Sequence, residues 1–232
     1  MTPEMLCARV LLRDANLLIL DKPAGLPVHA GPKAREALEA LLPGLSFGLR
    51  HVPALAHRLD QDTSGCLVLA RHPKALSRLG RLFSAGRIEK TYWALVEGGP
   101  QDPAGTIDLK LAKVTGPAGW RMIVDPVKGQ DAISAWRLLG HGEGLSWLEI
   151  RPRTGRTHQI RVHLAAQGWP ILGDPFYGRA DPAVPMQLLS RRVAVPYWEG
   201  RPPVVAEAPP PEAMRRRLEG CGWREAVAGL GG

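Results

Sequence analysis

The sequence runs His57-Arg-Leu-Asp-Gln-Asp-Thr-Ser-Gly65 and then Cys66-Leu-Val-Leu-Ala70. The second segment is a continuous apolar run of strand length, which indicates a buried β-strand. The first is polar and contains turn-forming Asp, Ser and Gly. We therefore expect a loop that presents two carboxylates, a guanidinium and an imidazole at the edge of a rigid scaffold, where such groups can line a cleft.

The residues of this loop alone leave several interpretations open. The segment from Asp62 to Gly65 is a good turn signal, and Arg58 with Asp60 could be an exposed ion pair of almost no energetic value. Asp60 and Asp62 could ligate magnesium, but no further carboxylate lies nearby in sequence to complete a hard-cation site. Catalysis is one alternative among these.

Outward from this loop, the pattern predicts short strands and helices separated by Gly and Pro turns. Strands are expected over residues 9–13, 16–21, 66–70, 91–96, 106–111, 120–124, 132–139 and 145–150. Helices are expected over residues 34–42, 73–87, 158–167 with Gly168 as its cap, and 212–219. The spacing of the strands favours antiparallel pairing over repeated strand-helix-strand units, so we expect one α+β domain over residues 1–232. Its C-terminal segment, 195–232, is basic and Pro-rich, and residues 195–211 are expected to lie extended over the surface.

The composition limits the class of protein. The 232 residues include 30 Lys and Arg against 22 Asp and Glu, a formal net charge of +8, and 45% are hydrophobic, which excludes wholesale disorder. This surplus of positive charge favours a polyanionic partner such as nucleic acid, although a merely basic surface would have the same composition. No apolar run approaches the ~20 residues of a membrane span, and no secretion signal is found, so a cytoplasmic protein that binds no membrane is expected.

The cysteines are few and far apart. Cys7, Cys66 and Cys221 show no CxxC spacing, which argues against a disulfide framework and against a cysteine-based zinc site.

A second basic cluster lies between Arg151 and His163 and contains four arginines and two histidines. If the segment is helical, His158 and Arg161 share one face. His158 and His163 do not fit a zinc site, because a separation of five residues turns them to different faces and no third ligand is apparent. Loop donors, a helix start and several guanidiniums suit an RNA or DNA backbone better; the alternative is a solvated basic helix start.

Two further positions remain ambiguous from the residues alone. Tyr92 lies next to Trp93 on a predicted strand, where an aromatic residue is more often part of the core than catalytic. Asp174 lies in a turn-rich loop and could be a structural cap.

Five segments, in this order along the chain, resemble motifs of the RluA-type pseudouridine synthase family. They are residues 16–29 (NLLILDKPAGLPVH), 57–65 (HRLDQDTSG), 89–92 (EKTY), 153–164 (RTGRTHQIRVHL) and 170–177 (PILGDPFY). The resemblance spans most of the chain and implies the family's fold: a mixed, mainly antiparallel sheet with flanking helices and a central catalytic cleft. It also implies isomerisation of uridine in RNA, in which the C1′–N1 bond breaks, the uracil turns over and C1′ is rejoined to C5.

The resemblance also assigns roles to individual residues. Asp60 matches the essential aspartate, Tyr92 matches the tyrosine that stacks on the uracil and is the expected base at C5, and Arg161 matches the basic residue that pairs with the aspartate. Arg58 matches the arginine that fills the gap left by the flipped-out base. His57, Arg153, Arg156 and His158 are expected to contact RNA together with Arg58.

The resemblance implies ribosomal or transfer RNA as the partner and requires neither a cofactor nor a metal; a monomer is expected. Many relatives carry an S4-type RNA-binding domain before the catalytic one, and we expect none here because the first of these motifs begins close to the start of the chain, at residue 16. The family's LHA segment reads Leu188-Leu189-Ser190, so Leu189 replaces its histidine.

Two other functions compete with this one. The chain could be a non-catalytic RNA-binding protein on the same scaffold, or a metal-dependent nuclease built on Asp60 and Asp62. Intact Asp60, Tyr92 and Arg161 argue against the first of these.

Overall fold

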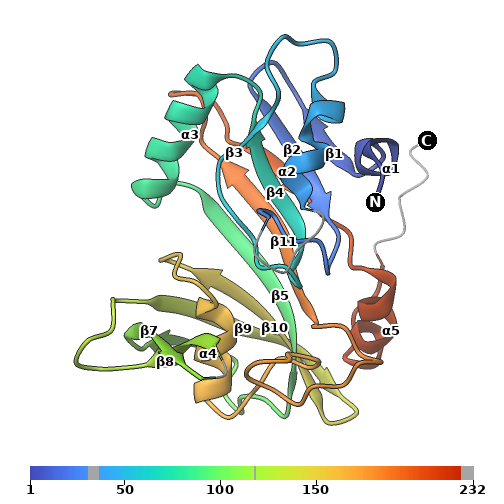
Figure 1. Ribbon diagram of the computed structural model, residues 1–232. Helices are drawn as coiled ribbons and strands as arrows, with labels where there is room; N and C mark the ends of the chain where they lie inside the picture. The colour runs from blue at the N-terminus through green and yellow to red at the C-terminus, as the bar shows by residue number, and fades with distance from the viewer. Residues whose placement is uncertain (31–36, 118, 226–232) are drawn as a thin grey trace.

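A computed structural model describes residues 1–30, 37–117 and 119–225 of the chain. Its main element is a ten-stranded sheet with the principal strand order β1-β2-β4-β11-β5-β10-β9-β6 (Figure 1). The strands in this order are β1 (Val10–Arg13), β2 (Leu17–Lys22), β4 (Ser64–Ala70), β11 (Leu188–Val195), β5 (Glu89–Glu97), β10 (Leu145–Pro152), β9 (Ile133–Gly142) and β6 (Ala104–Asp108). Strand β3 (Ala54–Leu55) pairs with β4, and β12 (Val204–Glu207) pairs with β11. Strands β7 (Leu111–Gly116) and β8 (Gly119–Val124) form a separate two-stranded sheet.

All of these strand pairs are antiparallel except β4 with β11. The expected mixed, mainly antiparallel α+β fold is therefore confirmed. Gly65 permits the parallel pair: its φ is +101°, and a Cβ at this position would lie 2.3 Å from the carbonyl oxygen of Ser190. Only glycine combines this backbone conformation with so close an approach of the next strand.

The N-terminal half of the sheet is covered on both faces, which explains the continuous apolar run from Cys66 to Ala70. Alternate residues of β2 and β4 pack into two different clusters, one with helix α3 (Pro73–Ser84) and one with helix α2 (Leu38–Leu41) and the 3₁₀ helix η1 (Leu42–Leu45). A strand buried on both faces needs apolar residues at every position.

The remaining helices lie around this sheet. They are α1 (Pro3–Cys7), α4 (Gln159–Ala166) and α5 (Glu212–Gly220). The expected helices at 158–167 and 212–219 are confirmed, and Gly168 ends α4 with a φ of +80°. Within the described ranges, no helix combines the length and hydrophobicity that crossing a membrane requires.

Several sequence-based expectations were wrong. Strand β11 was not predicted, yet it lies between β4 and β5, and β12 shows that residues 195–211 are not simply a surface segment. The strand expected over 106–111 is divided between β6 and β7, which belong to different sheets. The helix expected over 34–42 falls partly outside the described residues, and the described part continues as η1 through Pro43-Gly44, because proline is tolerated in a first helical turn.

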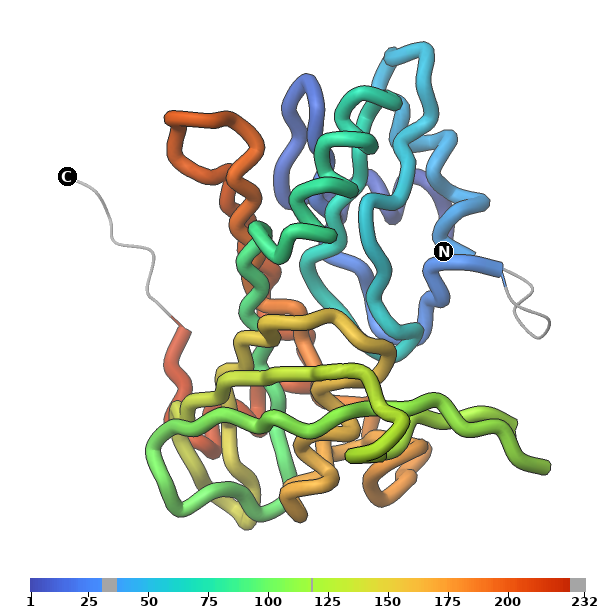
Figure 2. Tube along the Cα trace, turned by 90° about the vertical axis from the view of Figure 1, so that its left-hand side faces the viewer, coloured from blue at the N-terminus to red at the C-terminus, as the bar shows by residue number. Residues whose placement is uncertain are grey.

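Strands β5 and β11 run between two parts of the molecule (Figures 1 and 2). One part holds β1 to β4 with α1, α2 and α3, and the other holds β6 to β10 with α4. The candidate site lies where these two parts meet.

Candidate active site

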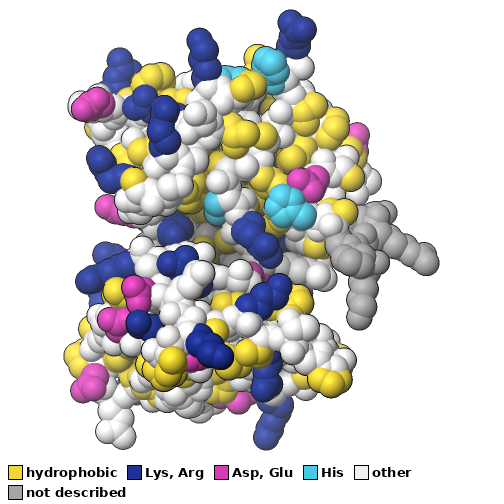
Figure 3. All heavy atoms as spheres, turned by 60° about the vertical axis from the view of Figure 1, so that its left-hand side comes forward, with side chains coloured by type: hydrophobic (Ala, Val, Ile, Leu, Met, Phe, Trp, Pro, Cys, Tyr) yellow, Lys and Arg dark blue, Asp and Glu magenta, His cyan; other side chains and the backbone are white. Residues whose placement is uncertain are grey.

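A cleft of about 1070 Å³ opens between the two parts of the molecule. Its lining includes the loop that follows β3, the end of α3, the start of β5 and the loop between β10 and α4. Figure 3 shows Lys and Arg side chains gathered along the boundary between the two parts of this face. The shape and charge of the cleft suit a polyanion.

Asp60 lies at the cleft and forms an ion pair with Arg161, whose Nη1 is 3.3 Å from Asp60 Oδ2. The Asp60 side chain is 16% exposed, so substrate can reach it, whereas the Arg161 side chain is only 3% exposed. The Arg161 guanidinium stabilises the Asp60 carboxylate electrostatically. The expected pairing of these two residues is thus present, although they are 101 positions apart in the chain.

Arg161 is held in place by a second carboxylate, Asp174. Arg161 Nε and Nη2 each donate to one oxygen of Asp174 at 2.8 Å, and the Asp174 side chain is fully buried. Asp174 Oδ1 also accepts from the backbone N–H groups of Phe176 and Tyr177. Burial opposes the Arg161 charge, but the hydrogen bonds and charges of Asp174 and Asp60 together raise the pKa of Arg161, which keeps its positive charge.

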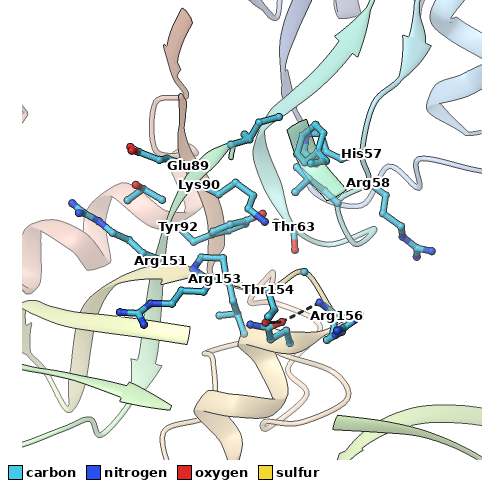
Figure 4. Close-up of a pocket in the computed structure, with 18 of the residues that line it drawn as sticks. His57, Arg58, Thr63, Glu89, Lys90, Tyr92, Arg151, Arg153, Thr154 and Arg156 are labelled. Atoms are coloured by element: carbon cyan, nitrogen blue, oxygen red, sulfur yellow. Dashed lines mark hydrogen bonds between the residues drawn. The ribbon is translucent and has the colours of Figure 1, made fainter. Parts of the chain in front are cut away.

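Tyr92 reaches the cleft from β5 and is 9% exposed (Figure 4). Burial raises the pKa of Tyr92, and the nearby Asp60 charge adds to the rise, while the Ser190 hydroxyl opposes it. The phenol is therefore neutral at physiological pH. Its ring is one wall of the cleft, in the place where a base could stack.

His158 faces Asp60 from the other side, with Nε2 at 3.8 Å from Asp60 Oδ2. Its backbone is left-handed, with a φ of +53°, an uncommon conformation for a residue other than glycine. The Tyr177 hydroxyl accepts from the Met122 N–H at 3.1 Å and lies within hydrogen-bond distance of His158 Nδ1, at 2.9 Å, which orients the ring so that Nε2 faces Asp60. Burial lowers the pKa of His158, although the Asp60 charge opposes this.

The basic loop between β10 and α4 is fixed by Gln159, which is buried. Its Oε1 accepts from the Thr154 hydroxyl and the Arg156 N–H, and its Nε2 donates to the Ile133 carbonyl and the Ser134 hydroxyl. These bonds tie the loop to β9. The exposed Arg153 and Arg156, which line the cleft, therefore extend from a rigid base (Figure 4).

His57 and Arg58, at the start of the loop formed by residues 57–65, differ in their surroundings. Arg58 is exposed at the cleft and extends away from Tyr92 (Figure 4). The His57 ring stacks on Phe83 at a centroid distance of 4.6 Å, and its Nε2 accepts from the Val68 N–H at 2.9 Å. Burial, with a smaller effect of the Lys90 charge, lowers the pKa of His57 to about 3. His57 thus supports the loop; its expected contact with RNA stays a prediction.

Lys22 is a fully buried lysine beneath the same loop. Its Nζ donates to the carbonyls of Pro23, Leu26 and Gln61 at 2.8, 2.9 and 2.8 Å. Burial lowers the pKa of Lys22 to about 7, with the charges of Asp62 and Asp60 opposing the shift. Because Gln61 follows Asp60 directly, the bond from Lys22 to the Gln61 carbonyl fixes the backbone next to the Asp60 carboxylate.

The structure brings together Asp60, Tyr92, Arg161, His158 and the predicted basic residues, all of which line one cleft. The sequence did not indicate the roles of Lys22, Gln159 and Tyr177, or that of Asp174, whose turn also fits a structural cap. All four lie inside the segments that resemble family motifs, which was the only available signal. His163 lies elsewhere, buried with both ring nitrogens within 3.0 Å of Ser134 Oγ and the Leu109 carbonyl.

These features define an enzyme-like cleft that is built to hold a polyanion. The sequence profile of the RNA pseudouridylate synthase family matches residues 16–166, a segment that contains Asp60, Tyr92 and Arg161.

Individual proteins agree with this match. An uncharacterized RNA pseudouridine synthase of Zymomonas mobilis is 46% identical over 214 residues, covering 90% of this chain and 97% of that protein. A ribosomal large subunit pseudouridine synthase D of the same organism is 36% identical over 188 residues, covering 78% of this chain and 59% of that protein. The structure of human RNA pseudouridylate synthase domain containing 4 superposes with a TM-score of 0.79 at 24% identity and covers 95% of both chains, which shows the shared fold.

The chain therefore belongs to the RNA pseudouridylate synthase family. Its activity is that of an isomerase that converts uridine in RNA to pseudouridine.

Proposed function

We propose that this chain isomerises specific uridines of ribosomal or transfer RNA, with Asp60 as the essential carboxylate. One observation carries the proposal: a partly exposed carboxylate lies in a basic cleft and is paired with a buried arginine. Such a pair keeps the carboxylate ionised and ready to act as a nucleophile or a base.

The proposed reaction follows from the chemistry of the target. A uridine within folded RNA must first be extruded, at a cost of a few kcal/mol, into a pocket that stacks on its base. Asp60 then attacks C1′ or removes a proton at C2′, and the C1′–N1 bond breaks. The uracil turns over and C1′ bonds to C5, while the Asp60–C1′ ester breaks or Asp60 returns the proton to C2′. The C5 proton then leaves, and N1 takes up a proton. Atoms and charge balance without a redox partner.

Tyr92 is assigned first to stacking on the extruded uracil, which its position on one wall of the cleft supports. Its role as the base at C5 stays a prediction, because burial raises its pKa and favours the neutral phenol. Arg58, at the rim, is assigned to the gap that the extruded base leaves, and Arg153 and Arg156 to the RNA backbone; His57 and His158 complete the predicted RNA contacts.

Ribosomal RNA as the substrate is supported by the name of the ribosomal large subunit relative. We further propose that residues 1–232 act as a single catalytic domain, as a monomer in the cytoplasm. The surplus of positive charge then serves to hold the RNA backbone, and binding should weaken steeply with salt.

The substitution Asp60→Asn tests the proposal, because it removes the charge and keeps the shape of the side chain. Pseudouridine formation should fall by about a thousandfold or more, a barrier increase of about 4 kcal/mol. RNA affinity, followed by fluorescence anisotropy, should stay within a few-fold. Activity is measured by tritium release from C5-labelled RNA and by mapping pseudouridines in RNA from cells with and without the gene.

Asp62→Asn is the matched control, because Asp62 is two positions away and does not line the cleft. It should leave the rate within a few-fold. Near wild-type activity of Asp60→Asn would refute the assignment, and a wild-type chain that binds RNA without forming pseudouridine would favour the non-catalytic alternative.

A further inference from the structure

An exposed tryptophan lies outside the cleft, in the loop between β11 and β12. Trp198 is 42% exposed, and the guanidiniums of Arg78 and Arg201 lie over its ring at 5.8 and 5.9 Å from the centroid. We call Trp198, Arg78 and Arg201 the Trp198 platform. The ring therefore offers a partly exposed aromatic face with two cations beside it.

The platform rests on ordered structure. Tyr197 packs edge-on against Trp198 at 4.9 Å, is itself 3% exposed, and donates its hydroxyl proton to Asn16 Oδ1 at 3.3 Å. The Arg201 N–H donates to the Trp198 carbonyl at 3.4 Å, and this tight turn brings Arg201 back toward the ring. The ring is therefore held in place and needs little ordering to receive a ligand.

Helix α3 connects the platform with the cleft. Lys74, Arg78 and Arg81 follow one another at i, i+4 and i+7 and so lie along one side of this helix. Phe83 and Ser84, at its end, line the cleft. Six residues of helix separate Arg78 from Ser84, a rise of about 9 Å. Figures 1 and 2 both show the loop after β11 beside α3.

Among the residues that the structure describes, the basic side chains along α3 and in the Trp198 platform are not neutralised by carboxylates of the protein. Within the described part of the chain, Lys74, Arg78, Arg81 and Arg201 form no ion pair with a carboxylate. This includes Glu199, which is adjacent to Trp198 in sequence. Arg78 Nε is buried and has no hydrogen-bond partner. A strand of phosphates would supply the missing negative charge.

We propose that the Trp198 platform stacks an unpaired base of the substrate RNA, on a strand that leaves the cleft along α3. The proposal rests on the RNA substrate given above. An aromatic ring provides a stacking surface for any base, and flanking guanidiniums bind the adjacent phosphates. The exposed Arg201 can move from the ring to a phosphate when a base takes its place. The cleft would bind the target uridine, and the Trp198 platform would bind an unpaired base of the neighbouring single strand.

The test compares two fluorescein-labelled probes, a dinucleotide and a fifteen-nucleotide oligouridylate, by anisotropy. Trp198→Ala should weaken binding of the long probe by about five- to hundredfold, the range for one stacked base, and leave the short probe within twofold. Arg201→Gln should weaken the long probe and reduce the slope of log K against log salt by about 0.7. Arg216→Gln is the matched control, an exposed arginine on α5, and should change neither probe.

Three results would overturn the proposal. They are unchanged binding of the long probe by Trp198→Ala, an equal loss for both probes, and a Trp198-dependent change in sedimentation, which would make the ring a contact between protein chains. Thermal melts confirm that each variant is folded. Pseudouridine formation by the wild type is a separate measurement: its absence, with Trp198-dependent binding intact, would refute the proposed activity and keep the platform.

Discussion

Two loops place a carboxylate against the same guanidinium, and they do so differently. The Asp174 turn binds Arg161 through two bonds of 2.8 Å and is fully buried, whereas the Asp60 loop binds it through one bond of 3.3 Å and stays partly exposed. The close pair orients the arginine, and the looser pair leaves a carboxylate with oxygen lone pairs for a substrate. A buried charge that is already neutralised by one partner can thus serve another residue without an unpaired charge in the core.

The largest difference between the two carboxylates is expected when the charge of Asp174, which holds Arg161, is removed. Asp174→Asn leaves a buried guanidinium with only the loose partner, so the free energy of unfolding should fall by about 3–5 kcal/mol. Asp60→Asn keeps the close pair and should cost about 1 kcal/mol or less. Urea titration of both variants checks this, and equal losses would mean that the two carboxylates share the arginine evenly.

Lys22→Met tests whether the Asp60 loop depends on support from below. The substitution keeps the volume and leaves three part-buried carbonyls without their donor, so stability should fall by about 2–3 kcal/mol and kcat should fall with little change in KM. Lys128→Met, at an exposed position, is the control. A stable variant with normal kcat would show that the loop holds its shape without Lys22.

Tyr177→Phe tests the contribution of His158, which like Arg161 is a neighbour of Asp60. It removes the hydroxyl that hydrogen-bonds His158 Nδ1 and leaves the ring in place. One lost hydrogen bond is equivalent to about 1 kcal/mol, so kcat should fall about fivefold to tenfold. The acid limb of the pH-rate profile should shift as well, because His158 loses a hydrogen-bond partner at Nδ1. An unchanged profile would remove His158 from the environment of Asp60.

His57→Gln concerns the dependence of stability on pH. The pKa of His57 is about 3 in the folded chain and near 6.5 when unfolded, so the unfolded state binds more protons between these values. The stability contributed by the neutral ring is complete above pH 6.5 and is lost as the pH falls toward 3. Melting temperatures from pH 7 to 5 should decline less steeply in His57→Gln than in the wild type, whereas replacement of the exposed His141 should leave the slope unchanged.

The sequence predicted the pairing of Asp60 with Arg161 and the place of Tyr92, because each lies in a segment that resembles a family motif. It did not predict that Asp174 holds Arg161, since a carboxylate in a turn has the same local signature whether it caps the turn or binds a distant arginine. Strand β11 was missed for a physical reason: its pairing with β5 shifts register between Ser190 and Arg192, and this irregularity, together with two adjacent arginines, hides the period of two. Long-range partners and bulges leave little trace in a single sequence.

The position of β11 has a consequence for how the chain is made. Strands β4 and β5 are neighbours in sequence, but β11 lies between them in the sheet, and it arrives more than ninety residues after β5. During synthesis, β4 and β5 each keep an unpaired edge until β11 has been made. Until then, the two walls of the cleft are not joined by one sheet. The last quarter of the protein therefore acts as the closing segment of the fold, and the cleft takes its final shape only when residues 188–195 have been inserted.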